Sequence, residues 1–343
     1  MVAGEDREVT LIRPTSEVAD PIGPRPRPGT GRAVVVLVLV ALGALIPLLG
    51  PSAALHGSGE AAPPGAGGVA LLRAVLFAAL SIPLGELFAR RLADAVSVAS
   101  PTAPRSWAPF AAGAGFLAAL GLASVVATGN LVPDSVAAID IGGLYESRAG
   151  KLALVEVNAF LVAGLCALSR RPATQVWPLA AVVVAEALRA HPPTETSPLL
   201  GSGLTLVHLT CAALWTGGLL SVLRTLRLWR SAEMGAALLG LYARLAAVLL
   251  AALTASGLTS SLRRMPADTI LDQLTTTAYG RTLLAKVLLV AVVALLALWA
   301  RIRLARATDP LTACAPARAE VVALGLVVAV SGLLTAVPLP IRW

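Results

Sequence analysis

The chain has 343 residues, of which 57% are hydrophobic and only 13% are charged, and its mean hydropathy is +0.81. These values lie outside the range of soluble domains and predict a polytopic membrane protein. The net charge of +8 does not indicate a nucleic-acid-binding protein, because the basic residues form short clusters between apolar runs and only 4% of residues are aromatic.

The first 32 residues are rich in proline, glycine, arginine and acidic residues and show no apolar periodicity. They predict a disordered tail. The apolar run at 33–54 is longer than the core of a signal peptide, so we expect it to be an uncleaved first membrane helix.

Further runs long enough to cross a bilayer predict an all-α bundle of about nine transmembrane helices. The fifth of the nine is the shortest. They lie at 33–54, 69–89, 107–128, 149–168, 174–190, 202–224, 236–261, 282–302 and 318–338. We expect three parts, namely the tail at 1–32, N-terminal helices at 33–171 and a second helical domain at 172–343.

Arginine and lysine gather in alternate loops, for example at Arg90 and Arg91, at Arg170 and Arg171, and at Arg224 and Arg227. The loops between them are neutral or acidic. The positive-inside rule then predicts that the N-terminus is inside and the C-terminus outside. In that orientation all three histidines, His56, His191 and His208, lie at or near the outer face.

The stretch 188–223, LRAHPPTETSPLLGSGLTLVHLTCAALWTGGLLSVL, holds two of the three histidines. His208, Cys211 and Trp215 follow one another at steps of three and four, which places them on one helix face. Imidazole and thiol are soft ligands that suit copper. The pattern therefore predicts a metal site with His191 and His208, to which Cys211 could be added.

Ionisable groups inside membrane spans usually face a cavity or a partner. Glu156 lies about two turns from the outer end of the run at 149–168 and is a further candidate for a metal or proton site. An ion pair of Glu156 with Lys286 or Arg73 is the alternative. Glu86 is expected to pair with Arg90, one turn away on the same helix.

Each site residue also has a structural interpretation. A histidine in a membrane span can serve only as a hydrogen-bonding link between helices, and Cys211 can be a small packing residue. We expect Trp215 to pack over Gly217 and Gly218, a pair that lets a neighbouring helix approach closely. The sequence contains no nucleotide, metalloprotease or hydrolase motif, so an enzyme is not expected.

The segments AHPP…LVHLTCAALWTGGLL, YARLAAVLLAALTASGLTSSL and YGRTLLAK resemble the copper resistance D family of bacterial membrane proteins. The resemblance spans roughly 188–338. The residues that match its motifs are His191, His208, Trp215, Gly217, Gly218, Tyr242, Arg244, Tyr279, Arg281 and Lys286. Here HPP stands in place of the family's GHA-like motif and tyrosine in place of a phenylalanine, and Cys211 is not a motif position.

The resemblance implies a multi-pass protein of the bacterial cytoplasmic membrane that takes up or handles copper, commonly with a separate extracytoplasmic copper-binding protein. Within that reading, Arg281 and Lys286 could gate the path or orient its carboxylates. Two alternatives stay open. The histidines could hold a single haem in a membrane redox protein, or the chain could be a copper-binding assembly scaffold without transport.

Overall fold

The computed structural model describes residues 30–96, 103–129, 135, 140–195, 197–229, 231–265, 267–306 and 314–339. Of the tail predicted at 1–32, residues 1–29 lie outside these ranges. The chain divides into two compact units, residues 1–38 and 39–343. The packing described below is that of the second unit.

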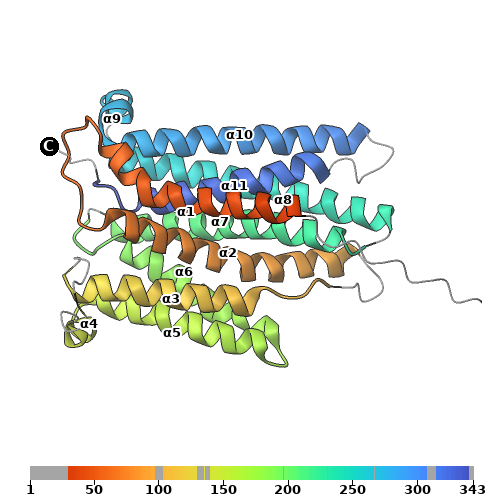
Figure 1. The fold of residues 1–343 in the computed structure, drawn as a ribbon, viewed down its shortest axis with the longest axis horizontal. Helices are drawn as coiled ribbons and strands as arrows, with labels where there is room; N and C mark the ends of the chain where they lie inside the picture. Colours follow the sequence, from red (N-terminus) through yellow and green to blue (C-terminus); the bar gives the residue numbers. More distant parts are fainter. Residues whose placement is uncertain are drawn as a thin grey trace, which may run out of the picture. The chain divides into compact units, whose positions relative to one another are not determined.

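All regular elements among the described residues are helices, as the sequence predicts (Figure 1). They are α1 (Thr30–Leu55), α2 (Ala66–Val96), α3 (Ala108–Ala127), α4 (Ile141–Glu146), α5 (Arg148–Leu168), η2 (Pro172–Gln175), α6 (Val176–Arg189), α7 (Pro198–Leu226), α8 (Ala232–Arg264), α9 (Ile270–Thr276), α10 (Ala278–Arg306) and α11 (Cys314–Leu334).

Among the described residues, eight helices are long and apolar enough to cross a membrane. The remaining expected span, the fifth at 174–190, corresponds to α6, which has only 14 residues. At about 1.5 Å per residue it measures about 21 Å, less than the roughly 30 Å of a bilayer core. The polytopic helical fold is thus confirmed, with one helix that does not reach across by itself.

Short polar caps set where several of these helices begin. Ser147 accepts a hydrogen bond from the amide of Gly150 at the start of α5, and Ser231 accepts one from Met234 at the start of α8. At the start of α10, the Glu60 carboxylate accepts a bond from the amide of Ala278 at 2.8 Å. The Thr277 hydroxyl accepts from the amide of Gly280 at 3.0 Å, so α10 has a local cap and a tertiary one from the loop between α1 and α2.

The α2 helix is the centre of the packing, because α3, α7 and α11 all pack along it. Its closest approach is to α7, where a Cβ on Gly85 would collide with the backbone of Gly217 and a Cβ on Gly217 would collide with the backbone of Ser81. Gly218, on the next position, faces the side chains of Phe88 and Tyr242. The pair Gly217 and Gly218 therefore lets a neighbouring helix approach closely, and that helix is α2.

The loops after α1, α6 and α8 meet at one end of the second unit, which also carries α9 and is called the α9 end below. Arg281 donates to the backbone oxygen of His56 at 2.6 Å, and Arg263 donates to that of Ser197 at 3.1 Å. The other end of the same helices, where α7 finishes and α3 begins, is called the opposite end.

At the opposite end, Glu86 does not pair with Arg90, so the expected pair within α2 is wrong. Its carboxylate instead accepts hydrogen bonds from Arg224 of α7 at 2.9 Å, from Ser106 at 2.5 Å and from the amide of Trp107 at 2.7 Å. Arg224 also lies over the Trp107 ring, 3.7 Å from its centroid. Glu86 therefore joins α2 to α7 and to the start of α3.

Candidate functional site

His191 lies just after the last residue of α6 and is buried, with 5% of its surface exposed. Its Nδ1 lies 2.7 Å from the Glu195 carboxylate, and its Nε2 lies 2.9 Å from the hydroxyl of Thr205 on α7. The ring packs against Gly201, where a Cβ would collide with it. The turn after α6 is thus fastened to α7 through this imidazole.

His208 lies on α7, three residues after Thr205, so Thr205 and His208 are about 4.5 Å apart along the helix axis. Its Nδ1 lies 3.1 Å from the hydroxyl of Ser256 on α8. Gly257 leaves room for the ring, because a Cβ there would be 3.4 Å from its Cε1. His191 thus contacts α7 at Thr205, and His208 lies about one turn further along the same face of α7.

Hydrogen-bond chemistry assigns the same tautomer to both rings. A carboxylate can only accept, so the bond to Glu195 requires the proton of a neutral His191 on Nδ1. The Ser256 hydroxyl gives its one hydrogen to the carbonyl of Leu253 at 3.1 Å, so its oxygen accepts from His208 Nδ1. In each ring the lone pair is then on Nε2, which is the arrangement of a histidine prepared for a metal.

Cys211 lies one turn beyond His208 on α7, is partly buried and carries a free thiol. Among the described residues, no group of three or more His, Cys, Asp and Glu side chains is arranged to hold a metal ion. A metal bound here would therefore take at most two such side chains in the conformation described. His191 reaches α7 at Thr205, three residues before His208, and Cys211 follows three residues after His208.

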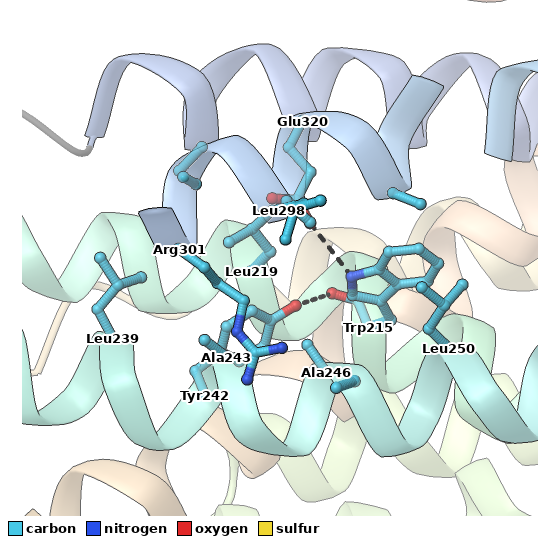
Figure 2. A pocket seen from close by; sticks show the side chains of 15 residues that line it. Trp215, Leu219, Leu239, Tyr242, Ala243, Ala246, Leu250, Leu298, Arg301 and Glu320 are labelled. Carbon is cyan, nitrogen blue, oxygen red and sulfur yellow. Dashed lines mark hydrogen bonds between the residues drawn. The ribbon is translucent and has the colours of Figure 1, made fainter. Parts of the chain in front are cut away.

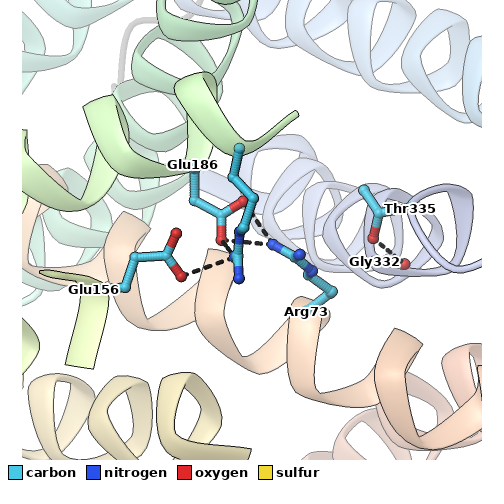
Figure 3. A network of polar contacts seen from close by, with 6 residues as sticks. Arg73, Glu156, Glu186, Gly332 and Thr335 are labelled. Atoms are coloured by element: carbon cyan, nitrogen blue, oxygen red, sulfur yellow. Dashed lines mark hydrogen bonds and ion pairs between the residues drawn. The ribbon is translucent and has the colours of Figure 1, made fainter. Parts of the chain in front are cut away.

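Glu156 belongs to a different group of buried charges, formed by α2, α5 and α6 (Figure 3). Its carboxylate accepts a bond from Arg189 at 2.8 Å, and neither Arg73 nor Lys286 is its ion-pair partner. Arg73 instead donates to both oxygens of Glu186 at 2.6 Å, and Glu186 also pairs with Arg189. We call these four residues, Arg73, Glu156, Glu186 and Arg189, the charge cluster.

The charge cluster has two positive and two negative side chains, so its formal charges cancel. Burial of a charge is tolerated when partners and hydrogen bonds compensate for the loss of water. Glu156 has no exposed surface, and one of its oxygens has no partner among the described residues. The cluster joins α2, α5 and α6 and ends two residues before His191.

Residues 236–335 match the model of the family described as Copper resistance protein D. The predicted family resemblance is confirmed for these residues, whereas the motif positions from His191 to Gly218 lie before the matched range. No curated protein and no solved structure gives a match. The family match implies a membrane protein of copper resistance or copper handling. The matched residues, called the CopD segment below, comprise most of α8 and all of α9 and α10, and they reach to just past the end of α11.

Tyr279, Gly280 and Arg281 form a tight corner of the CopD segment at the α9 end. Arg281 donates to the carbonyls of Thr275 and His56, at 2.7 and 2.6 Å. A Cβ on Gly280 would collide with the backbone of Gln273 and Leu274, and the Tyr279 hydroxyl lies 3.3 Å from Arg264. In this conformation these motif residues fix how α9, α10 and the loop after α1 meet.

Tyr242 and Trp215 lie deeper between the helices. The Tyr242 hydroxyl donates to the backbone oxygen of Trp215 at 2.7 Å, which ties α8 to α7. Trp215 does not cover the glycine pair, which faces α2 and Tyr242. Its indole Nε1 donates instead to Glu320 of α11 at 3.2 Å (Figure 2).

Arg244 and Lys286, the two remaining motif cations, differ in their surroundings. The Arg244 side chain is exposed on α8, whereas Lys286 on α10 is half-buried. Neither forms an ion pair within the described residues. Lys286 is close enough for its charge to act on the imidazole of His208.

Glu320, which is 4% exposed and lies in the CopD segment, was not among the residues predicted from the sequence. The signal was present, since Glu320 is the third residue of the apolar run at 318–338 and an ionisable group inside a span marks a cavity or a partner. The structure shows both. The partner is Trp215, and the cavity is described below.

Proposed function

We propose that this chain binds copper at His191 and His208 and passes it across the membrane. The family match supports copper handling, and the tautomer shared by His191 and His208 supports these residues as ligands. In this proposal both histidines coordinate through Nε2. Neutral imidazoles can replace the water around a cuprous ion without burying additional negative charge.

Binding would require only one local exchange at His191. The Thr205 hydroxyl donates to Nε2 of this ring, at 2.9 Å, and would turn away to free the lone pair for copper. Glu195 and Ser256 would keep holding the two Nδ1 atoms, which fixes the orientation of both rings. Cys211 is a candidate third ligand because its thiol is free and one turn from His208.

We propose that the α9 end faces the outside of the bacterial cytoplasmic membrane, so that copper enters on the side of His191 and moves inward along α7. The placement of arginine and lysine supports this orientation. A separate extracytoplasmic copper-binding protein would then deliver the ion. Reporters fused after Arg171 and Ser197 should read cytoplasmic and external, respectively, and reversed signals would overturn both the orientation and the direction.

The site is tested by copper binding to purified protein in detergent. Replacing either His191 or His208 by alanine should weaken binding by about 2 kcal/mol, roughly thirtyfold, because a ligand is lost. The double variant should cost clearly less than the sum of the two, since ligands of one ion are not additive. Cys211→Ser, run in parallel, shows whether the thiol belongs to the site.

His56→Ala is the matched control, because His56 is an exposed imidazole at the same end. It should leave copper affinity unchanged. Unchanged affinity in both the His191 and the His208 variant, with the protein folded, would show that these histidines only link helices.

A further inference from the structure

A cavity of about 240 Å³ lies between α7, α8, α10 and α11, on the half of the unit toward the opposite end (Figure 2). Most of its wall is apolar, with leucines from three helices, among them Leu219, Leu239 and Leu298. The cavity can hold a small polar group with a short apolar stem, and not a whole lipid.

Two side chains of opposite charge line this cavity without pairing with each other. Glu320 enters from α11 and uses one oxygen to accept from Trp215. Arg301 enters from α10, and Figure 2 shows its guanidinium extending toward Ala243 and Tyr242. Neither charge has an ion-pair partner among the described residues. The wall thus offers one anionic and one cationic contact to the same occupant.

The cavity opens sideways between α8 and α10. These two helices barely touch, because α8 packs on α7 and α10 packs on α11. Leu298 lines the cavity and is 54% exposed, and Arg301 is exposed as well. In a membrane, this opening faces lipid.

The depth of both charges matches that of lipid headgroups. Glu320 lies about 9 Å along α11 from Cys314, and Arg301 about 8 Å along α10 from Arg306, at 1.5 Å per residue. Arg303 stacks on Trp299 at 5.1 Å, and tryptophan paired with arginine is typical of a membrane interface. Arg301 and Glu320 therefore lie near the ends of the candidate spans Ala278–Arg303 and Ala317–Leu334, where headgroups are within reach.

We propose that the cavity binds a phospholipid whose headgroup carries a primary ammonium. The ammonium donates to Glu320, the phosphate accepts from Arg301, and the acyl chains leave through the opening and lie along the exposed apolar faces of α8 and α10. A zwitterionic headgroup satisfies both charges at once. An anionic lipid without an amine would leave Glu320 unpaired, and a quaternary ammonium has no hydrogen to donate.

The experiment compares lipids with identical chains by native mass spectrometry of the purified full-length protein. The probes are phosphatidylethanolamine, its mono- and dimethyl derivatives, phosphatidylcholine and phosphatidylglycerol. We expect one tightly retained phosphatidylethanolamine, with retention falling at each added methyl group. Equal retention of all five lipids by the wild type would overturn the proposal, whatever the variants do.

Two variants assign the contacts. Glu320→Gln should weaken retention of phosphatidylethanolamine by about tenfold and so abolish its preference over phosphatidylglycerol. Arg301→Gln should weaken retention of both lipids by about tenfold. In each case a charge-assisted hydrogen bond is lost. The matched controls are Glu233→Gln and Arg303→Gln, which change the same residue types at positions that do not line the cavity. An ethanolamine preference that persists in Glu320→Gln would place the lipid elsewhere.

Discussion

The charge cluster ends at Arg189, two residues before His191 of the histidine pair, yet the two groups satisfy their polar atoms in opposite ways. In the cluster, guanidinium and carboxylate groups bond to one another. In the histidine pair, the Nδ1–H of each ring donates to an oxygen acceptor, and the lone pair of the ring is on Nε2. The cluster is thus suited to holding helices in place. The histidines are the residues that we propose as ligands for reversible binding of copper.

The packing around the two groups differs as well. In α2 and α3, 39% of the most apolar stretch is buried, against 17% in α8 and 6% in α10, although α11 of the same CopD segment reaches 44%. The charge cluster thus involves α2, one of the more buried helices, whereas His208 contacts Ser256 on α8, one of the less buried ones. Measurements of stability and of copper binding should therefore separate the two groups.

The largest expected effect is on stability, from the cluster. Glu186→Gln removes the carboxylate that both Arg73 and Arg189 contact and leaves the cluster with a net positive charge. We expect a loss of about 3–5 kcal/mol in the free energy of unfolding, because a buried charge is left without its partner. Unfolding of the purified protein in detergent measures this loss.

A double replacement tests the cause of that effect. Arg73→Met combined with Glu186→Leu removes one positive and one negative charge together and keeps the pair of Arg189 with Glu156, so it should cost less than Glu186→Gln alone. Glu146→Gln, at an exposed carboxylate on α4, is the control. A loss below about 1 kcal/mol in Glu186→Gln would mean that the cluster does not hold the helices.

The next effect is on copper affinity, from the residues that orient the histidines. Glu195→Ala and Ser256→Ala each remove the acceptor of one Nδ1 hydrogen. We expect copper binding to weaken by about 10- to 100-fold in each variant, as is typical when the partner of a metal-bound histidine is lost. Titration of the purified variants with cuprous ion measures the change.

Thr259→Ala serves as the control for Ser256→Ala, because it removes an exposed hydroxyl from the same helix. It should leave the affinity as in the wild type. If Ser256→Ala and Thr259→Ala behave alike, the bond to Ser256 does not prepare His208 for a metal, and the contrast with the cluster is lost.

The smallest effect is expected from exchanging cations. Lys286→Arg and Arg244→Lys keep the charge, and either side chain can extend its cationic end toward water. Copper binding should change by no more than about threefold if charge alone is required. A larger loss at Lys286 with normal folding would show that the geometry of its ammonium group near His208 matters.

The sequence by itself determined the all-helical membrane fold, the family resemblance and the positions of the histidines. Apolar runs of this length can satisfy their backbone groups in a bilayer only as helices, so local composition is sufficient to predict them. The three-residue and four-residue steps from His208 to Cys211 and Trp215 likewise follow from helix geometry alone. The short α6 was also visible as the shortest of the nine runs.

Only the tertiary structure decided which polar groups meet. Glu86 bonds Arg224 and not Arg90, Glu156 bonds Arg189, and Trp215 bonds Glu320. In the first and last of these contacts the residues are more than 100 positions apart. Such choices depend on which helix faces are in contact, and here the close approach of α2 and α7 at Gly85 and Gly217 sets part of that arrangement. Hydropathy carries no information about rotation of one helix against another, because every face of these helices is apolar enough to enter the membrane.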